Sequence, residues 1–359
     1  MEYSETPQID AHSRILHDTR FCIKQSPTLL RMILYNVFTW VREKFVPMLL
    51  WITGPIESYL GLPGAANCTY AQQICPNPYV TFYLYTTDHP EPRLLNPNYP
   101  DNITSSLFMT GKPIKIMLHG YNSSHTTFPN IIIGPEYLAA GNYNVIAAEF
   151  EELVKKDCYL NAMKNMPVIA NCTAQFIGFL VNSLGVSLQD IHVIGFSLGA
   201  PIAGQIANYM KWGKLSRITG LEPALPPLQD LSKKPDILDK GDADFVDIIH
   251  TQIGTLGKVR STGHVDFYVN NGFKQPSCPK PGFLCSHGRS VSYYAESITT
   301  PIGFWGYRCP DVIDATIFTD RCSSNSSILM GEYTNSSARG IYKVDTHDKP
   351  PYAMGKNRG

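Results

Sequence analysis

The stretch IHVIGFSLGAPIAG (191–204) decides the fold. It begins with Ile191–Ile194, a short apolar run of the kind that buried parallel strands show. Residues 195–199 then match Gly-x-Ser-x-Gly, and small residues recur through a helix predicted at Leu198–Met210. The flanking glycines remove Cβ atoms that would collide around a serine on a sharp strand-to-helix turn. The stretch therefore predicts a strand, a tight turn that carries Ser197, and a helix packed closely on a sheet.

Three further runs resemble the strand before Ser197. Each has four or five apolar-rich residues bounded by Gly, Asn, Asp or His, and they are Ile114–Leu118, Val145–Ala148 and Val246–Ile249. A helical pattern, in which Pro167 suits the start, lies between the second run and residue 191. This alternation predicts an α/β fold with a mostly parallel central sheet and helices on both faces. Beyond about residue 300 we expect an irregular, tethered closing segment.

The composition is that of a globular protein. Of 359 residues, 43% are hydrophobic and 17% are charged, which excludes a disordered protein and a coiled coil. Thirty basic residues balance thirty acidic ones, so attraction to nucleic acid or to an acidic membrane is not supported. No charge-free apolar run of about eighteen residues occurs, which excludes a polytopic membrane protein. Without internal repeats or a linker, we expect one main domain at 67–359.

The cysteines and glycosylation acceptors indicate an oxidising, secretory route. Eight cysteines remain when Cys22 of the polar N-terminal stretch is set aside, and their spacing lacks the close pairs of a zinc site. Buried, reduced cysteines in a cytosolic enzyme are the alternative. Asn-x-Ser/Thr occurs six times where chance gives roughly two or three, at Asn67, Asn102, Asn122, Asn171, Asn325 and Asn335. We therefore expect a secreted, disulfide-bonded protein.

Residues 1–66 form an N-terminal extension of different character. Residues 1–27 are polar and have no signal-peptide features. Two apolar patches follow within residues 28–53, split by Arg42-Glu43-Lys44. We expect an internally placed signal that is cleaved. A signal anchor and an amphipathic helix packed on the domain remain alternatives.

Ser197 needs a base held by an acid, and in this architecture the chain order is Ser, Asp/Glu, His. Glu222 in ITGLEPA (218–224) stands at the end of an apolar run, and His287 stands beside a cysteine in CSHGRS (285–290). His192 and His250 lie within or at the end of predicted strands, so we interpret them as structural.

A wider pattern surrounds these residues. Ten stretches keep one order over residues 68–359: ICPNPYVTFYLYTT (74–87), IMLHGY (116–121), NVIAAEF (144–150), HVIGFSLGAPIAG (192–204), ITGLEPA (218–224), DKGDADFVDIIHT (239–251), GHVDFYVNNG (263–272), QPSC (275–278), CSHGRS (285–290) and YYAESI (293–298). In these stretches the chain resembles the pancreatic lipase family, in particular single-domain secreted insect lipases and phospholipases A1. The resemblance implies an α/β-hydrolase fold and lipid ester hydrolysis without a cofactor.

Carried over by position, Ser197 resembles the nucleophile, Glu222 the acid and His287 the base. The oxyanion hole would come from the backbone N–H groups of Leu198 and Tyr121, and each such donor is worth about a hundred- to a thousand-fold in turnover. On family grounds we also expect a Cys278–Cys285 disulfide. Cys309–Cys322 and Cys68–Cys75 are weaker expectations.

The chain departs from the family pattern at three places. The acid is usually Asp, whereas Glu222 is one methylene longer; Asp266 is an alternative carboxylate. Glu149 and Phe150 stand where Asp and Trp are usual, and we interpret them as changes in packing and local hydrogen bonding. The acidic calcium loop of the family is only partly kept: Asp239 and Asp242 remain, but Lys234 stands where an acid is common. We therefore expect no bound calcium.

The span between Cys278 and Cys285 bears on the substrate. In the family this disulfide closes a lid of some twenty residues, whereas here six residues, Pro279–Leu284, lie between the cysteines, and two are prolines. Such a span cannot form an amphipathic helix. We therefore expect an open cleft, little interfacial activation, and phospholipid or short-chain ester substrates. Loops elsewhere that cover the site are the alternative.

Three interpretations remain open. The first is a secreted lipid carboxylic ester hydrolase that makes transient contact with lipid surfaces. The second is a non-catalytic relative that binds lipid, as the yolk-protein relatives of this family do. The third is a hydrolase anchored in a membrane through residues 28–53. Too few residues follow His287 for the C-terminal β-sandwich of larger members, so colipase is not expected as a partner.

Overall fold

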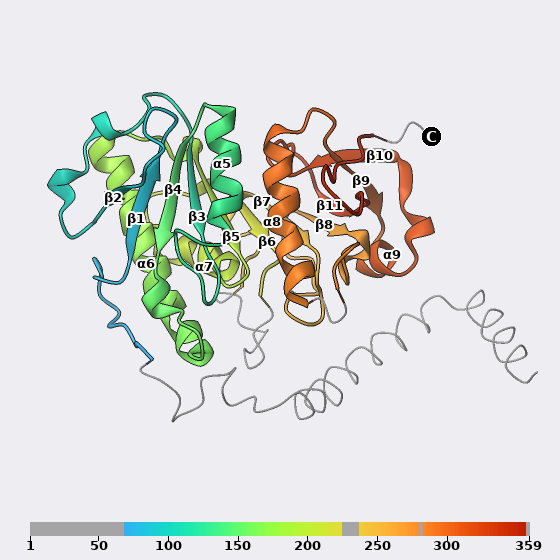
Figure 1. Cartoon of the computed structure of the whole chain (residues 1–359), viewed down its shortest axis with the longest axis horizontal. Helices are drawn as coiled ribbons and strands as arrows, with labels where there is room; N and C mark the ends of the chain where they lie inside the picture. The colour runs from blue at the N-terminus through green and yellow to red at the C-terminus, as the bar shows by residue number, and fades with distance from the viewer. Residues whose placement is uncertain (1–67, 225–236, 280–282, 357–359) are drawn as a thin grey trace, which may run out of the picture. The chain divides into compact units, whose positions relative to one another are not determined.

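The computed structural model describes residues 68–224, 237–279 and 283–356. The expected extension at 1–66, with its segment 28–53, lies outside these ranges, as do Asn67 and Lys234. The described part contains an eleven-stranded sheet with helices against it (Figure 1).

Most of the sheet is parallel. In spatial order the strands are β10 (Ser323–Met330), β9 (Phe304–Cys309), β11 (Gly340–Val344), β8 (Val265–Val269), β7 (Ala243–His250), β6 (Leu215–Leu221), β5 (Ile191–Phe196), β3 (Ile114–Leu118), β4 (Asn144–Glu149), β1 (Thr81–Tyr85) and β2 (Arg93–Leu95). The seven strands from β11 to β4 pair in parallel, and antiparallel strands extend both ends. The carboxyl ends of the parallel strands therefore meet at one edge of the sheet.

Helices cover both faces of this sheet, as predicted. Ile116 and Leu118 of β3 pack in one core with α6 (Tyr159–Leu184) and α7 (Gly199–Ile206). Met117, which points the other way, packs in a second core with α5 (Asn130–Ala140) and α8 (Phe283–Thr299), which lie side by side in Figure 1. Alternate residues of one strand thus face two cores, which is why the central strands read as continuous apolar runs.

Two disulfides join the segment before β1 to α6 and to the residue just before it. Cys68 bonds to Cys158 and Cys75 bonds to Cys172, so the expected Cys68–Cys75 pair is wrong. The physical reason is that the segment runs beside α6: the Asn165 side chain accepts from the backbone N–H of Ala71 at 3.1 Å. Sulfurs far apart in sequence are therefore closer than the two that are near in sequence. Cys278–Cys285 and Cys309–Cys322 form as expected.

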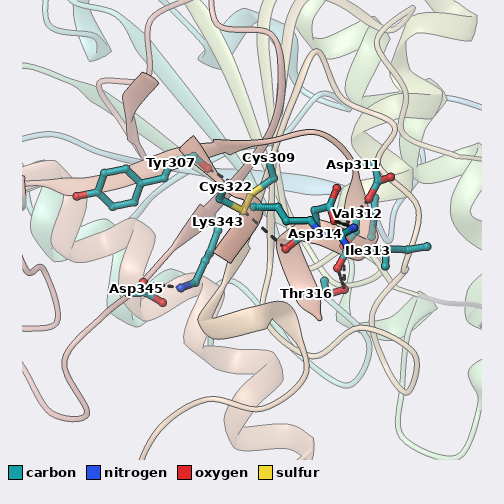
Figure 2. Close-up of a disulfide and its surroundings, with 11 residues drawn as sticks. Tyr307, Cys309, Asp311, Val312, Ile313, Asp314, Thr316, Cys322, Lys343 and Asp345 are labelled. Carbon is teal, nitrogen blue, oxygen red and sulfur yellow. Dashed lines mark hydrogen bonds and ion pairs between the residues drawn. A yellow bond between two sulfur atoms is a disulfide. The ribbon is translucent and has the colours of Figure 1, made fainter. Parts of the chain in front are cut away.

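The closing segment is more regular than expected. It supplies β9, β10, β11 and the short helix α9 (Val312–Thr316), whose first turn is capped by the Asp311 side chain accepting from the Asp314 N–H at 2.9 Å. Figure 2 shows the Cys309–Cys322 disulfide beside this helix. The expectation of irregular structure was wrong. Strand β11 alternates buried and part-exposed residues, so its sequence lacks the continuous apolar run from which the central strands were predicted.

Helix α6 begins at Tyr159, so Pro167 lies inside it rather than at its start. The proline is tolerated because its neighbours Met166 and Val168 are buried and hold the helix on the sheet. Among the described residues, α6 is the one helix long and apolar enough to cross a membrane by length and composition. It packs in the core and carries a disulfide at Cys172, which is how a buried core helix of a globular domain behaves.

Candidate active site

Ser197 lies on the sharp turn between β5 and α7. Its φ of 54° is in the left-handed region, which costs energy in a residue with a side chain. The turn is held because the Ser197 N–H donates to the Leu221 carbonyl at 3.0 Å. A Cβ at Gly199 would lie 2.6 Å from the His119 carbonyl oxygen, so only glycine fits there. Within residues 191–206, all of them described, Ser197 alone is not buried.

Two backbone N–H groups lie beside Ser197. A Cβ built on Gly120 would approach the Ser197 Cβ at 3.0 Å, which places the turn before Tyr121 against the serine. Leu198 follows Ser197 directly and is the N-cap residue of α7. Neither the Leu198 nor the Tyr121 N–H donates to any residue that the structure describes. Two such free donors beside a serine can stabilise negative charge on an acyl oxygen.

Glu222 and His287 face each other at the same edge of the sheet. Glu222 follows β6 directly, is fully buried, and has its Oε1 3.8 Å from His287 Nδ1. Neither of these two atoms has a hydrogen-bond partner within the described ranges. The other carboxylate oxygen, Oε2, accepts from the Thr251 N–H and from its hydroxyl at 3.1 Å. One oxygen of Glu222 is therefore anchored and the other is aimed at the imidazole.

The His287 ring also lies next to the serine turn. Its centroid is 4.9 Å from the ring of Phe196, the residue before Ser197. Phe128 also packs edge-on against Phe196, with ring centroids 5.0 Å apart. The serine, histidine and glutamate regions, far apart in sequence, therefore converge at the carboxyl ends of β5 and β6.

Asp266 does not serve His287. Its Oδ1 lies 2.8 Å from Nε2 of His250, and its Oδ2 accepts from the Gly263 N–H at 3.0 Å. The structure therefore assigns the alternative carboxylate to a different, buried histidine. His192 is likewise buried, with its Nε2 2.8 Å from the Thr219 hydroxyl. Both strand histidines have the structural environment expected for them.

The Glu149–Phe150 departure builds a packed cluster behind the Tyr121 turn. Phe150 stacks on His119 at 3.7 Å, and its N–H donates to His119 Nε2 at 3.3 Å. Glu149 accepts from the ring and backbone N–H of His125 at 2.5 and 3.0 Å. Burial alone would raise the pKa of Glu149, but the His125 hydrogen bonds outweigh it and the pKa is lowered. The cluster ties the loop after β3 to β4.

His119 predicts a pH dependence of stability. Burial lowers its pKa to about 4, against about 6.5 in an unfolded chain. As the pH falls below the unfolded value, the unfolded state takes up the proton first, so this stability is lost between about pH 6.5 and pH 4. We expect a loss of about 2 kcal/mol from about pH 7 to pH 5 in urea unfolding. In His119→Gln the free energy of unfolding should depend less on pH over this range. If it depends on pH as strongly as in wild type, His119 is not the cause.

The remaining predicted residues fall at separate places. Asp239 and Asp242 bond within their own turn, where the Asp242 carboxylate accepts from the Asp239 N–H at 2.7 Å. Burial raises the pKa of Asp242 to about 7. Among the described residues, no three His, Cys, Asp or Glu side chains cluster as a metal site would require.

Most described acceptor asparagines are accessible. Asn102, Asn122 and Asn335 are exposed, and Asn171 is half-buried on α6. Asn325 lies in β10. The short disulfide-closed span ends on Phe283 and Leu284, whose exposed fractions are 48% and 80%.

Sequence reasoning did not single out Thr251, Gly257 or His125. Thr251 holds Glu222, and a Cβ at Gly257 would overlap the carboxylate of Glu222. Thr251 ends the stretch DKGDADFVDIIHT (239–251), but the pattern does not indicate its role. The roles of Thr251 and Gly257 depend on the space around the Glu222 side chain, which comes from another part of the chain. The position of Thr251 at the end of β7, next to Glu222 at the end of β6, is the signal that could have found it.

Comparison with known proteins decides the family. The family model described as Lipase matches residues 63–339. The chain belongs to the lipase family. Pancreatic triacylglycerol lipase of Mus musculus is 30% identical over 305 residues, covering 76% of this chain and 64% of that protein. Pancreatic lipase-related protein 2 of Homo sapiens is 33% identical, covering 64% of this chain and 53% of its own length.

These relatives confirm the resemblance to pancreatic lipases, although the chain spans only about half to two thirds of their length. Among solved structures, an α/β hydrolase enzyme from a Medee basin deep-sea metagenome library aligns with a TM-score of 0.30 at 18% identity, over 53% of this chain and 71% of that one. Bacillus licheniformis lipase BlEst2 aligns with a TM-score of 0.28 at 13% identity, over 40% and 67%. The lipase family assignment rests on the sequence matches.

Proposed function

We propose that this lipase-family protein is a serine hydrolase of lipid carboxylic esters, with Ser197, His287 and Glu222 as its triad. The observation that carries the proposal is the approach of Glu222 Oε1 to His287 Nδ1 beside the Ser197 turn, two buried atoms that have no hydrogen-bond partner among the described residues. A carboxylate in this place holds the imidazole with Nδ1 protonated, which leaves Nε2 as the base for the serine.

The reaction follows from these positions. His287 Nε2 takes the proton of the Ser197 hydroxyl as its oxygen attacks the ester carbonyl carbon. The resulting oxyanion is stabilised by the N–H groups of Leu198 and Tyr121. His287 then returns the proton to the leaving alcohol, and the acyl group stays on Ser197. His287 takes a proton from water as the water oxygen attacks the acyl carbon. His287 then gives this proton to the Ser197 oxygen as the fatty acid leaves, which restores the serine hydroxyl and the neutral histidine.

One observation favours a second candidate, a lipid-binding protein without catalysis. The Glu222–His287 separation of 3.8 Å exceeds a normal hydrogen bond. A substrate panel separates the two functions: triacylglycerol, phosphatidylcholine, phosphatidylserine and a short-chain ester, each titrated for released acid. The hydrolase predicts turnover of at least one ester. Binding of these lipids by the folded protein with no acid released would support the binder instead.

The short span between Cys278 and Cys285 supports an open site and guides the substrate proposal. Six residues between bonded cysteines are too few for an amphipathic flap, so this span forms no helical lid that would have to move before a single ester molecule enters. We therefore propose phospholipids and short-chain esters as preferred substrates, as in phospholipases A1.

This proposal predicts weak interfacial activation. The rate with a short-chain triacylglycerol should rise smoothly through its solubility limit, because the site is already accessible to monomers. The measurement is the rate of acid release on both sides of that limit at constant protein concentration. An abrupt rise as droplets form would contradict the open site.

Secretion is supported by four disulfides and by the exposed acceptor asparagines. Produced in animal cells, the protein should reach the medium, and its mass should fall on treatment with an amidase that removes N-linked glycans. N-terminal sequencing of that form distinguishes cleavage from anchoring through residues 28–53. Recovery only from the cytosol, with free thiols, would contradict secretion.

A further inference from the structure

Gly257 lies against the carboxylate of Glu222. A Cβ at this position would overlap Glu222 Oε1 and lie 2.5 Å from its Cδ. Gly257 does not have the left-handed φ that favours glycine, so backbone conformation does not require it. What the site requires is the absence of a side chain.

The loop that carries Gly257 cannot move away from such a contact. The loop that carries Gly257 is tied to the chain after Glu222, because the Lys258 N–H donates to the Pro223 carbonyl at 2.9 Å and Gly257 forms a β-bridge with Ala224. The Gly257 N–H itself donates to the Gln252 carbonyl at 3.1 Å. The loop is therefore pinned from both sides.

The carboxylate is restrained as well. Its Oε2 is held by the N–H and hydroxyl of Thr251, and the whole side chain is buried. An added methyl group at residue 257 would therefore displace Oε1, and Oε1 is the atom that faces His287. An aspartate at 222 would withdraw its carboxylate by about one carbon–carbon bond, or about 1.5 Å, and so avoid the methyl group.

We propose that Gly257 is a positioning residue, whose missing side chain provides the space through which the Glu222 carboxylate reaches His287. The inference rests on the proposed triad and explains how the chain accommodates a glutamate there. It makes residues 222 and 257 a matched pair: a glutamate needs a glycine opposite it, whereas an aspartate does not.

The test compares wild type, Gly257→Ala, Glu222→Asp and the double variant, with Gly134→Ala as control. Gly134 lies on α5, and a Cβ there meets nothing closer than 3.9 Å. Gly257→Ala should lower kcat by about 10² to 10⁴-fold with little change in KM, because histidine orientation is lost. Glu222→Asp should cost up to about 100-fold. The double variant should stay within about threefold of Glu222→Asp, and Gly134→Ala should match wild type.

A second readout does not depend on hydrolysis. The proposal requires that Glu222 Oε1 and His287 Nδ1, 3.8 Å apart in this structure, close to a hydrogen bond in the working protein. The Nδ1 proton should then give a low-field proton NMR signal in wild type and Gly134→Ala that is missing in Gly257→Ala. The proposal is overturned if the kcat losses of the two single variants multiply in the double variant. It is also overturned if Gly257→Ala keeps both the NMR signal and wild-type kcat. If wild type hydrolyses no ester yet the signal responds as described, the hydrolase function fails and the positioning role stands.

Discussion

Ser197→Ala is expected to lower the turnover of the best ester in the panel by about a million-fold. Removing a triad nucleophile abolishes the acyl-enzyme route, and only the oxyanion donors and substrate binding remain to accelerate hydrolysis. Because Ala fits a turn where Ser197 is part-exposed, the fold should persist. The measurement is single-substrate kinetics on both proteins at matched concentration.

Ser106→Ala is the matched control for this loss. Ser106 is exposed and its hydroxyl contacts that of Thr104 at 2.8 Å, away from the site. The control should retain full activity. Unchanged turnover in Ser197→Ala would show that hydrolysis proceeds elsewhere and would remove Ser197 from the mechanism.

Glu222→Gln is expected to lower turnover by about ten-thousand-fold. The amide keeps the shape of the side chain, but it is neutral and presents no carboxylate to His287 Nδ1, so the imidazole is no longer held in the tautomer that serves Ser197. KM should change little, because Glu222 is fully buried and is not exposed to substrate. The measurement is kcat and KM for the same ester.

Glu91→Gln is the control for the loss of turnover in Glu222→Gln. Glu91 is exposed, so this variant should have wild-type turnover. Thermal unfolding of Glu222→Gln shows whether the protein remains folded when activity is measured. The predicted loss of turnover is about 10⁴-fold. If a folded Glu222→Gln variant keeps more than about a tenth of wild-type turnover, the Glu222 carboxylate does not orient His287.

The sequence predicts the sheet better than the surroundings of the site. Ile114–Leu118 is a strand with those bounds, and Val145–Ala148 lies within β4, because strands buried on both faces leave uninterrupted apolar runs. The sharp turn at Ser197 is likewise predicted from adjacent residues, those of the Gly-x-Ser-x-Gly motif. These features are local, so neighbouring residues carry their signal.

What could not be predicted depends on distant residues. Cys75 pairs with Cys172 because its segment runs along α6, a placement that spacing does not encode. The space that Gly257 leaves for Glu222 exists only after β6 and the loop at 252–258 are brought together. Pro167 suggested a helix start because proline favours that position, yet burial of its neighbours keeps the helix continuous.

Covalent labelling with a fluorophosphonate tests the central claim most directly, since it needs no knowledge of the natural ester. The account predicts one adduct per folded molecule, located on Ser197 by peptide mass mapping, absent in Ser197→Ala and formed far more slowly in Glu222→Gln. Folded wild-type protein that takes up no label, or that takes it up on another residue, would contradict a serine activated by His287 and Glu222.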